Sequence, residues 1–472
     1  MKKILNSIKK NLYIVVFLPI ITNSLINLSQ DQKFLYFTEP KVYIFLISFC
    51  FACMFFYSIS IIIDNSFELS SKSLSITYFL LSYFLFDNLL LPFTKYVKFK
   101  ISFYIVSILW IYIIVFIKKH YFASLKVVLI YIAWRLYNFK YFDQLSDLIE
   151  YKELNTDVPL QWFKLAKLIY DNNYFHALEN NLIEGQGLLP SYIQSLLLSI
   201  GFNVQSFIFI QLTSNILIFF GILLIFDLNI SKNEKIILSL AFLSLVLNND
   251  WLFYLIGNSL MLEGIVSFLI GVFLLNYKKY FDEDSLKSKV FFLFFGSLIL
   301  TKNFVSIMTL FLVLGGIIFI KKNKSIVLGF VVYLFYLSYE KILFREINSI
   351  SYTGEINFKI LFQDLIFLRN LYFTNIGNIL NQLYLDKPLF YFFTIFLILN
   401  IYNFITSKNI EFTEAFILIF VLVNYLLVNI LYISYWQSIE YESSYRYIIN
   451  TFYLVLISTG LNASKLIKKI NF

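Results

Sequence analysis

Stretches of about 17 to 22 residues that are almost free of charge recur along the whole sequence. Such a stretch forms a helix long enough to cross the hydrocarbon core of a bilayer, which is roughly 30 Å thick. Lipid offers no hydrogen-bonding partner, so a crossing segment must satisfy its own peptide groups as a helix. Hydrophobic residues make up 59% of the chain and charged residues only 14%, against about one quarter in soluble proteins. We therefore predict an all-α polytopic membrane protein.

We expect about fourteen transmembrane helices, one for each apolar stretch. No small-residue cleavage site follows the first stretch, so we interpret it as a retained helix. The predicted ranges are 11–28, 41–63, 73–93, 100–117, 121–138, 204–227, 234–249, 258–277, 287–301, 303–320, 324–342, 388–406, 412–433 and 446–464.

Lysine-rich short segments set the predicted orientation, because such segments stay on the cytoplasmic side of a membrane. With both termini inside, six of these segments share that side, and the formal net charge of +9 indicates helix ends rather than a nucleic-acid surface. The segment PFTKYVKFK at 92–100 is the exception, since it falls outside. The excess of Lys, Asn, Ile, Tyr and Phe is typical of an A+T-rich bacterial gene, and we expect a bacterial inner membrane.

Three long connections are predicted on the outer face, at 139–187, 343–387 and 434–445, and long connections often carry function. The first is net acidic. It leads into EGQGLLPSYIQSLLLSIGFN, whose apolar part from Leu188 to Ile200 is too short to cross a bilayer. We expect an interfacial or re-entrant helix there.

All arginines of the chain fall at the outer face in this topology: Arg135, Arg345, Arg369 and Arg446. A guanidinium group is a planar fork of donors that grips phosphate oxygens in pairs. The pattern therefore favours a lipid-linked phosphate at the membrane surface. The alternative is that these side chains reach lipid headgroups or pair with nearby carboxylates, such as Glu442 one helical turn before Arg446. Glu440 and Glu442 are further site candidates.

Further polar residues gather at the predicted outer ends of spans. Asp250 follows one span, Glu263 lies in the first turns of the next, and Lys302 occupies the turn LTKNF between two others. A carboxylate just inside a span is costly unless it is paired or meets water, which makes Glu263 a site candidate. Asp87 has a similar position in the third span. A solvated charge is the alternative reading for Lys302.

The first outer loop contains NTDVPLQWFKLAKLIYDNN, which predicts a helix with Asp157 as its cap and Trp162, Leu165, Ala166 and Ile169 at helical spacing. An acidic residue shortly after a span, an amphipathic helix and then PSYIQSLLLSIG form a layout that resembles the first exofacial loop of polyprenyl-phosphate-sugar-dependent glycosyltransferases of the GT-C type. The resemblance covers about residues 121–464. It implies extra N-terminal helices at 1–120 and a catalytic region at 121–472 that includes loops 139–203 and 343–387.

The resemblance implies an inverting glycosyltransferase that moves a sugar from a polyprenyl-phosphate donor to a glycan or lipid acceptor on the outer face. Asp157 is then the general base, with Asp143 and Asp147 as competitors and His176 as a further alternative. Arg446 is implied to hold the donor phosphate, together with Lys302, Arg345 or Arg369. No cofactor is required. A divalent metal suits the acidic loop, but no ligand spacing specifies one, and we expect Cys50 and Cys53 to be inert thiols within a span.

Two other functions fit parts of this pattern. An O-antigen-type polymerase or ligase also has many spans, long outer loops and outward arginines. A lipid-linked glycan flippase or transporter usually carries ionisable groups or broken helices near the middle of the bilayer, whereas the middle of these spans is almost entirely Ile, Leu, Phe and Val. The predicted acidic cap directly after a span favours the transferase.

Overall fold

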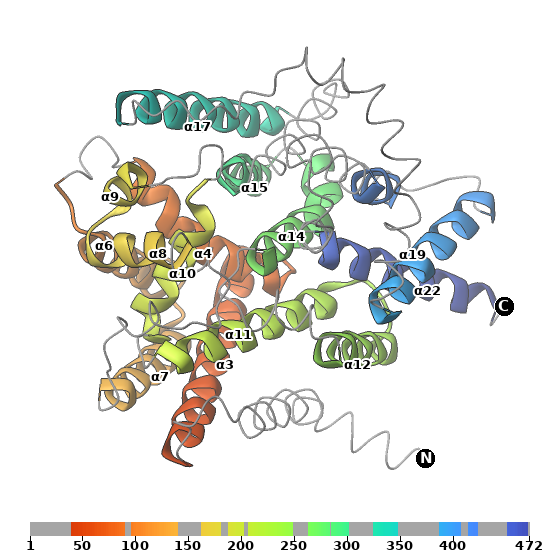
Figure 1. The fold of residues 1–472 in the computed structure, drawn as a ribbon, viewed down its shortest axis with the longest axis horizontal. Helices are drawn as coiled ribbons and strands as arrows, with labels where there is room; N and C mark the ends of the chain where they lie inside the picture. The colour runs from red at the N-terminus through yellow and green to blue at the C-terminus, as the bar shows by residue number, and fades with distance from the viewer. Residues whose placement is uncertain are drawn as a thin grey trace, which may run out of the picture. The chain divides into compact units, whose positions relative to one another are not determined.

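The computed structural model describes residues 39–89, 96–139, 162–180, 187–202, 206–248, 263–283, 285–301, 324–347, 387–406, 414–422 and 451–470. Every regular element within these ranges is a helix (Figure 1). The chain divides into two compact units, one of Met1–Phe175 with Ser191–Leu262 and one of His176–Pro190 with Glu263–Phe472. The predicted division at residue 120, between extra N-terminal helices and a catalytic region, is a division by function and stays a prediction.

The first unit is built from long helices and a set of short ones. The long helices are α3 (Glu39–Phe67), α4 (Lys72–Leu89), α6 (Phe99–Tyr112) with its π-helical continuation η1 (Ile113–Ile117), α7 (Tyr121–Phe139), α11 (Ser206–Asp227) and α12 (Lys232–Asn248). The short ones are α8 (Phe163–Asp171), α9 (Tyr174–Glu179), α10 (Leu189–Leu197) and η4 (Leu198–Phe202), of which α9 and the start of α10 reach into the second unit.

The second unit contains α14 (Glu263–Asp282), α15 (Leu286–Gly296) with η6 (Ser297–Leu300), α17 (Ser325–Ile347), α19 (Lys387–Thr406), the helical segment 414–422 and α22 (Phe452–Ile470). Helices α15 and α17 cross closely because both have glycine at the crossing. A Cβ on Gly296 would lie 2.5 Å from the carbonyl oxygen of Gly329, and one on Gly329 would lie 2.9 Å from that of Phe292. Such small residues let helices approach within a membrane.

Three helices in the described part of the chain are long and apolar enough to span a bilayer: Phe45–Phe67, Phe99–Ile117 and Glu263–Asp282. Shorter apolar helices occupy several other predicted ranges, including Asn215–Asp227 and Tyr391–Thr406. The described residues are thus all helical and include three candidate membrane spans, whereas the number of fourteen spans stays a prediction. The predicted ranges 11–28 and 303–320 lie outside the described residues.

Aromatic side chains fill the core of the first unit around α3. Phe55 lies 6.3 Å from Phe79 of α4 and 6.0 Å from Trp134 of α7, measured between ring centroids. Phe56 lies 5.1 Å from Phe220 of α11 in an edge-to-face arrangement. Edge-to-face rings are a favoured geometry of aromatic pairs, so these contacts fix α4, α7 and α11 around α3.

One end of α4 is fixed by a carboxylate from another helix. Asp227 accepts hydrogen bonds from the backbone N–H groups of Lys72 (3.1 Å) and Ser73 (2.7 Å) and from the hydroxyls of Ser71 (2.9 Å) and Ser73 (2.5 Å). The first N–H groups of a helix have no partner within the helix, and a negative charge there is favourable. Asp227 therefore ties the end of α11 to the beginning of α4.

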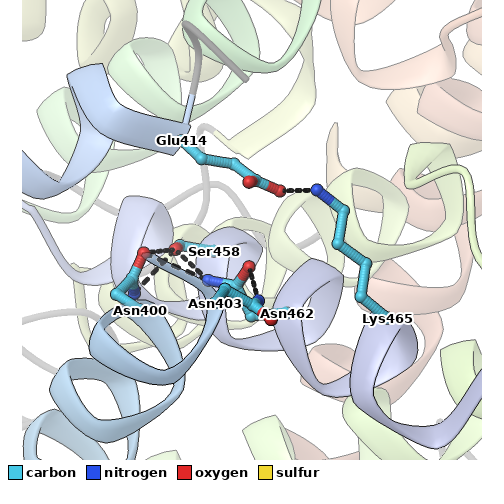
Figure 2. A network of polar contacts seen from close by, with 6 residues as sticks. All are labelled: Asn400, Asn403, Glu414, Ser458, Asn462 and Lys465. Atoms are coloured by element: carbon cyan, nitrogen blue, oxygen red, sulfur yellow. Dashed lines mark hydrogen bonds and ion pairs between the residues drawn. The ribbon is translucent and has the colours of Figure 1, made fainter. Parts of the chain in front are cut away.

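In the second unit, amide side chains connect α19 to α22 (Figure 2). The Asn462 amide donates to the side-chain oxygen of Asn400 (3.1 Å) and to Ser458 Oγ (3.2 Å), and its oxygen accepts from Asn403 (2.6 Å). One turn further along α22, Lys465 pairs with Glu414. Hydrogen bonds between side chains of neighbouring helices stabilise helix pairs in a membrane.

Candidate functional site

Most of the predicted site residues lie outside the described part of the chain. Two lie within it. Glu263 is the first residue of α14 and is fully buried (0% exposed), as expected for a carboxylate inside a span. Arg345 is placed near the C-terminal end of α17 by its backbone. The other predicted residues lie outside the described part of the chain: Asp143, Asp147, Asp157, Asp250, Lys302, Arg369, Glu440, Glu442 and Arg446. The convergence of all these groups on one cleft stays a prediction.

The described part of the first outer loop folds as the sequence predicts. Helix α8 (Phe163–Asp171) is amphipathic. The positions predicted for its apolar face are buried, with Leu165 at 2% and Ala166 and Ile169 at 0% exposure, and Trp162 before them at 2%. The apolar stretch that follows is also helical, from Leu189 through the π-helical turn η4 to Phe202.

This loop docks on the ends of α4 and α6 that lie away from Asp227. The backbone N–H of Phe99, at the beginning of α6, donates to the carbonyl of Asn172 at the end of α8 (2.7 Å). The Tyr192 hydroxyl of α10 donates to the carbonyl of Tyr83 in α4 (3.0 Å). Segments far apart in the sequence are thus joined at one corner of the first unit, formed by α4, α6, α8 and α10.

The same contacts show which loops lie at each end of α4. The end that begins at Lys72 contacts Asp227, whereas the other end contacts Tyr192 and Tyr174, the first residue of α9. The predicted topology places 92–100 and 139–203 on one side and the loop before α4 and the end of α11 on the other. The described contacts have this grouping, while the compartment that each side faces stays a prediction.

Asp87 is buried at this corner, near the C-terminal end of α4. It is 0% exposed, and neither of its carboxylate oxygens accepts a hydrogen bond from any residue that the structure describes. The hydroxyls of Ser102 and Tyr192 face it. Tyr192 donates elsewhere, to Tyr83, and Ser102 Oγ has no hydrogen bond within the described chain. Such a group is costly to bury, and an unsatisfied one in a folded protein marks a candidate site.

Aromatic rings from α4, α6, α9 and α10 contact one another at this corner. The ring of Tyr192 lies 5.2 Å from Phe84 and 5.3 Å from Phe99, and Tyr174 lies 5.7 Å from Phe84. Asp87 itself is fully buried. A polar group that reaches Asp87 would find unfilled hydrogen-bonding capacity on Asp87 and Ser102 in a low-dielectric environment, where each hydrogen bond is stronger than in water.

The described residues contain no group of three or more His, Cys, Asp or Glu side chains arranged for a metal ion. His176 Nδ1 lies 3.3 Å from a carboxylate oxygen of Glu179 on α9, as an exposed pair separated by one turn. Cys50 and Cys53 are free thiols on α3.

Sequence reasoning noted Asp87 but did not rank it among the principal site residues, and it missed Ser102 and Tyr192. A charged residue inside an apolar stretch was the available signal for Asp87. Nothing in the sequence pairs it with Ser102 or Tyr192, since hydroxyl side chains are frequent throughout the spans.

Comparison of the chain with known protein families, with curated protein sequences and with solved structures finds no match.

Proposed function

We propose that this protein is a membrane glycosyltransferase that moves a sugar from a polyprenyl-phosphate donor to an acceptor glycan or lipid at the outer face of a bacterial inner membrane. One observation supports this proposal most. The loop after α7, which carries the predicted catalytic carboxylates, docks through α8 and α10 on the ends of α4 and α6 beside the buried carboxyl group of Asp87. The loop is thereby held at the end of the helices, where we expect a lipid-linked substrate to bind.

The proposed reaction needs a base and a stabilised leaving group. The acceptor oxygen attacks the anomeric carbon of the sugar, its proton passes to the carboxylate of Asp157, and the bond from the anomeric carbon to the phosphate oxygen breaks with its electron pair on the phosphate. A positioned base contributes typically about 10²- to 10⁴-fold. Arg446, with Lys302, Arg345 or Arg369, is proposed to stabilise the developing charge on the phosphate.

Asp87 is given a positioning role in this proposal. Its unfilled acceptor capacity and the aromatic rings at the same corner suit a hydroxyl group of a sugar. Asp87 is fully buried, so this role requires the corner of α4, α6 and α10 to open on substrate binding. A hydrogen bond from a substrate hydroxyl to Asp87 would then orient the sugar while Asp157 takes the proton.

The test is transfer of labelled sugar from a polyprenyl-phosphate donor by the full-length protein in proteoliposomes. We expect Asp157→Asn to lower the rate by about 10²-fold or more. Asp171→Asn is the matched control, because Asp171 is an exposed acid of the same loop at the end of α8. An unchanged rate for Asp157→Asn would remove this residue from the mechanism.

The product of the same assay separates the alternatives. A transferase adds one sugar to the acceptor, whereas a polymerase or ligase joins a preassembled glycan. A flippase moves labelled lipid between leaflets without forming a glycosidic bond. Absence of a new glycosidic bond with every donor tested would contradict the proposal.

A further inference from the structure

The structure gathers lysines from two distant segments at the corner of α4, α6, α8 and α10. Lys98 and Lys100 flank the first residue of α6 and are exposed. Lys164 and Lys167 belong to α8, where Lys164 is exposed and Lys167 half-buried. We call these four residues the lysine corner. The first pair belongs to the segment that breaks the positive-inside rule, so its position calls for a physical reason.

Backbone and side-chain contacts bring the two pairs together. The hydrogen bond from the Phe99 N–H to the Asn172 carbonyl (2.7 Å) joins the beginning of α6 to the end of α8. The Lys100 Nζ atom lies 4.8 Å from the centre of the Tyr170 ring. Lys167 precedes Tyr170 by three residues, which places both on one face of α8. Figure 1 shows α6 and α8 next to each other.

Carboxylates do not neutralise the lysine corner within the described residues. None of its four lysines forms an ion pair with a described Asp or Glu, including Asp171 at the end of α8. The apolar face of α8 is buried against the protein, so its lysines point away from the core. Four like charges held together repel one another, and an anion bound among them would relieve that repulsion.

The depth of the lysine corner in the membrane follows from its position at the end of α6. The predicted span formed by α6 and η1 begins at Phe99, directly between Lys98 and Lys100, and only 17% of the searched part of that span is buried within the protein. Ile101, Tyr104 and Ile108 are 49%, 62% and 65% exposed. An apolar face so exposed contacts acyl chains, and the lysines at its end then lie among the phosphates of the headgroups.

We propose that the lysine corner binds the headgroups of anionic phospholipids and thereby holds α8 on the bilayer surface. The ligand class follows from charge and position, because four ammonium groups at the end of a lipid-exposed helix face singly charged phosphodiesters at high local concentration. Lysine is a flexible point charge that suits such loosely ordered groups. This interaction does not depend on the proposed transferase activity, and it gives segment 92–100 a reason to keep its lysines outside.

The test uses full-length protein reconstituted in vesicles of phosphatidylcholine with one fifth phosphatidylglycerol. A photo-crosslinking amino acid, benzoylphenylalanine, replaces Ile101 just below the lysine corner, and in a second preparation it replaces Phe116 at the opposite end of the same span. Mass spectrometry of the crosslinked lipids gives the ratio of phosphatidylglycerol to phosphatidylcholine, and the enrichment is the factor by which this ratio exceeds the ratio in the bilayer. Each lysine near an anionic surface contributes about 1 kcal/mol, or about fivefold.

At the Ile101 position we expect phosphatidylglycerol to be enriched about fivefold or more, and we expect the enrichment to vanish when the lysine corner is changed to Gln. Changing the same four residues to Arg keeps the charge and is expected to keep the enrichment. Neither change is expected to alter the lipids crosslinked at the Phe116 position. If the fourfold Gln variant does not fold, judged by gel filtration, the pair Lys164→Gln and Lys167→Gln provides the test with a partial loss.

Three results would overturn the proposal. The first is no enrichment at the Ile101 position in the unmodified protein, and the second is an enrichment that the Gln changes leave intact. The third is displacement of phosphatidylglycerol by undecaprenyl phosphate at a hundredfold lower concentration, which would mean that the lysine corner selects a lipid carrier instead of bulk phospholipid. Failure of the sugar-transfer assay would not affect any of these measurements.

Discussion

Two regions of this protein bury polar side chains among apolar helices, and they differ in how those side chains are satisfied. Between α19 and α22, Asn400, Ser458 and Asn462 hydrogen-bond to one another, and Asn403 bonds to Asn462. At the corner of α4, α6 and α10, Asp87 is equally buried, but its oxygens bond to no described residue. A network in which each buried polar group has a hydrogen-bonding partner adds stability. A buried polar group without a partner lowers stability, so stability does not explain why the chain keeps it.

We infer different tasks for the amide network and for Asp87. The amide network holds two helices in register, and its loss should affect folding first. Asp87 forms no hydrogen bond within the described chain that would account for its burial, and we propose a task in function for it. Substitutions that keep the shape of each side chain but remove its charge or its hydrogen bonds separate these tasks, because activity and stability then change independently.

Between the two regions, the largest effect on activity is expected for Asp87→Asn, which keeps the shape of the side chain and removes its charge. If the Asp87 carboxylate orients the substrate, a hydrogen bond to a charged group is replaced by a weaker one to a neutral amide, which costs about 1–2 kcal/mol and lowers the rate of sugar transfer by about 5- to 30-fold. The thermal midpoint of unfolding should not fall, since no described hydrogen bond is lost. Proteoliposome assays and thermal unfolding of the same preparation measure both quantities.

Asp64→Asn is a suitable control for Asp87→Asn, because Asp64 lies at the other end of the α3–α4 pair and accepts a hydrogen bond from the Ser71 N–H (3.2 Å). Its substitution should leave the transfer rate unchanged. A fall in the thermal midpoint of Asp87→Asn that accounts for its lost activity would show that Asp87 is structural, and the contrast between the two regions would disappear.

The next effect is expected for Asn462→Leu in the amide network. The substitution removes three hydrogen bonds, to Asn400, Ser458 and Asn403, while Asn400 and Ser458 keep the hydrogen bond between them. Interhelical hydrogen bonds in membrane proteins contribute about 0.6 kcal/mol each on average and at most about 1.7 kcal/mol. We expect the free energy of unfolding to fall by about 2 kcal/mol, with an unchanged transfer rate per folded molecule. Loss of activity without loss of stability would reverse the assignment.

The helices themselves were largely predictable from hydropathy. The sequence predicts 100–117 and 121–138, and the structure has Phe99–Ile117 and Tyr121–Phe139, because lysines and a histidine separate these apolar stretches. C-terminal ends were predicted less well. Helix α14 continues past the predicted end at 277 to Asp282, and α22 past 464 to Ile470. Hydropathy marks where a helix leaves the lipid. The helical backbone can continue into water beyond that point, and Lys278 and Lys279 favour this because lysine is a good helix former.

The site was far less predictable, for a physical reason. The long helices α3, α4 and α11 are apolar on all sides, so their sequences do not indicate which face meets which neighbour. The meeting of Asp87 with Ser102 and Tyr192 depends on those faces. Helix α8 is amphipathic instead, and its buried residues were predicted correctly for that reason.

The two ends of α4 sharpen the contrast further, since both carry a carboxylate. Asp227 accepts four hydrogen bonds at the beginning of the helix, and Asp87 accepts none from the described residues near its end. We expect Asp227→Ala to lower the free energy of unfolding by about 1–2 kcal/mol, the usual effect of losing a helix cap. Thermal unfolding measures this, with Asp227→Asn as the milder variant. A stabilised Asp227→Ala protein would contradict the capping role.

The smallest effect is expected for the ion pair that borders the amide network. Lys465 is 40% exposed and Glu414 10% exposed, so water screens the pair on one side. Exposed ion pairs contribute about 0–1 kcal/mol, and we expect Glu414→Gln to lower the free energy of unfolding by less than about 1 kcal/mol because the amide can still accept from Lys465. The decrease should shrink as salt is raised to 1 M, where the screening length is about 3 Å. A salt-independent loss as large as that of Asn462→Leu would mean that Glu414 belongs to the buried network, and that the closed network extends beyond its amide groups.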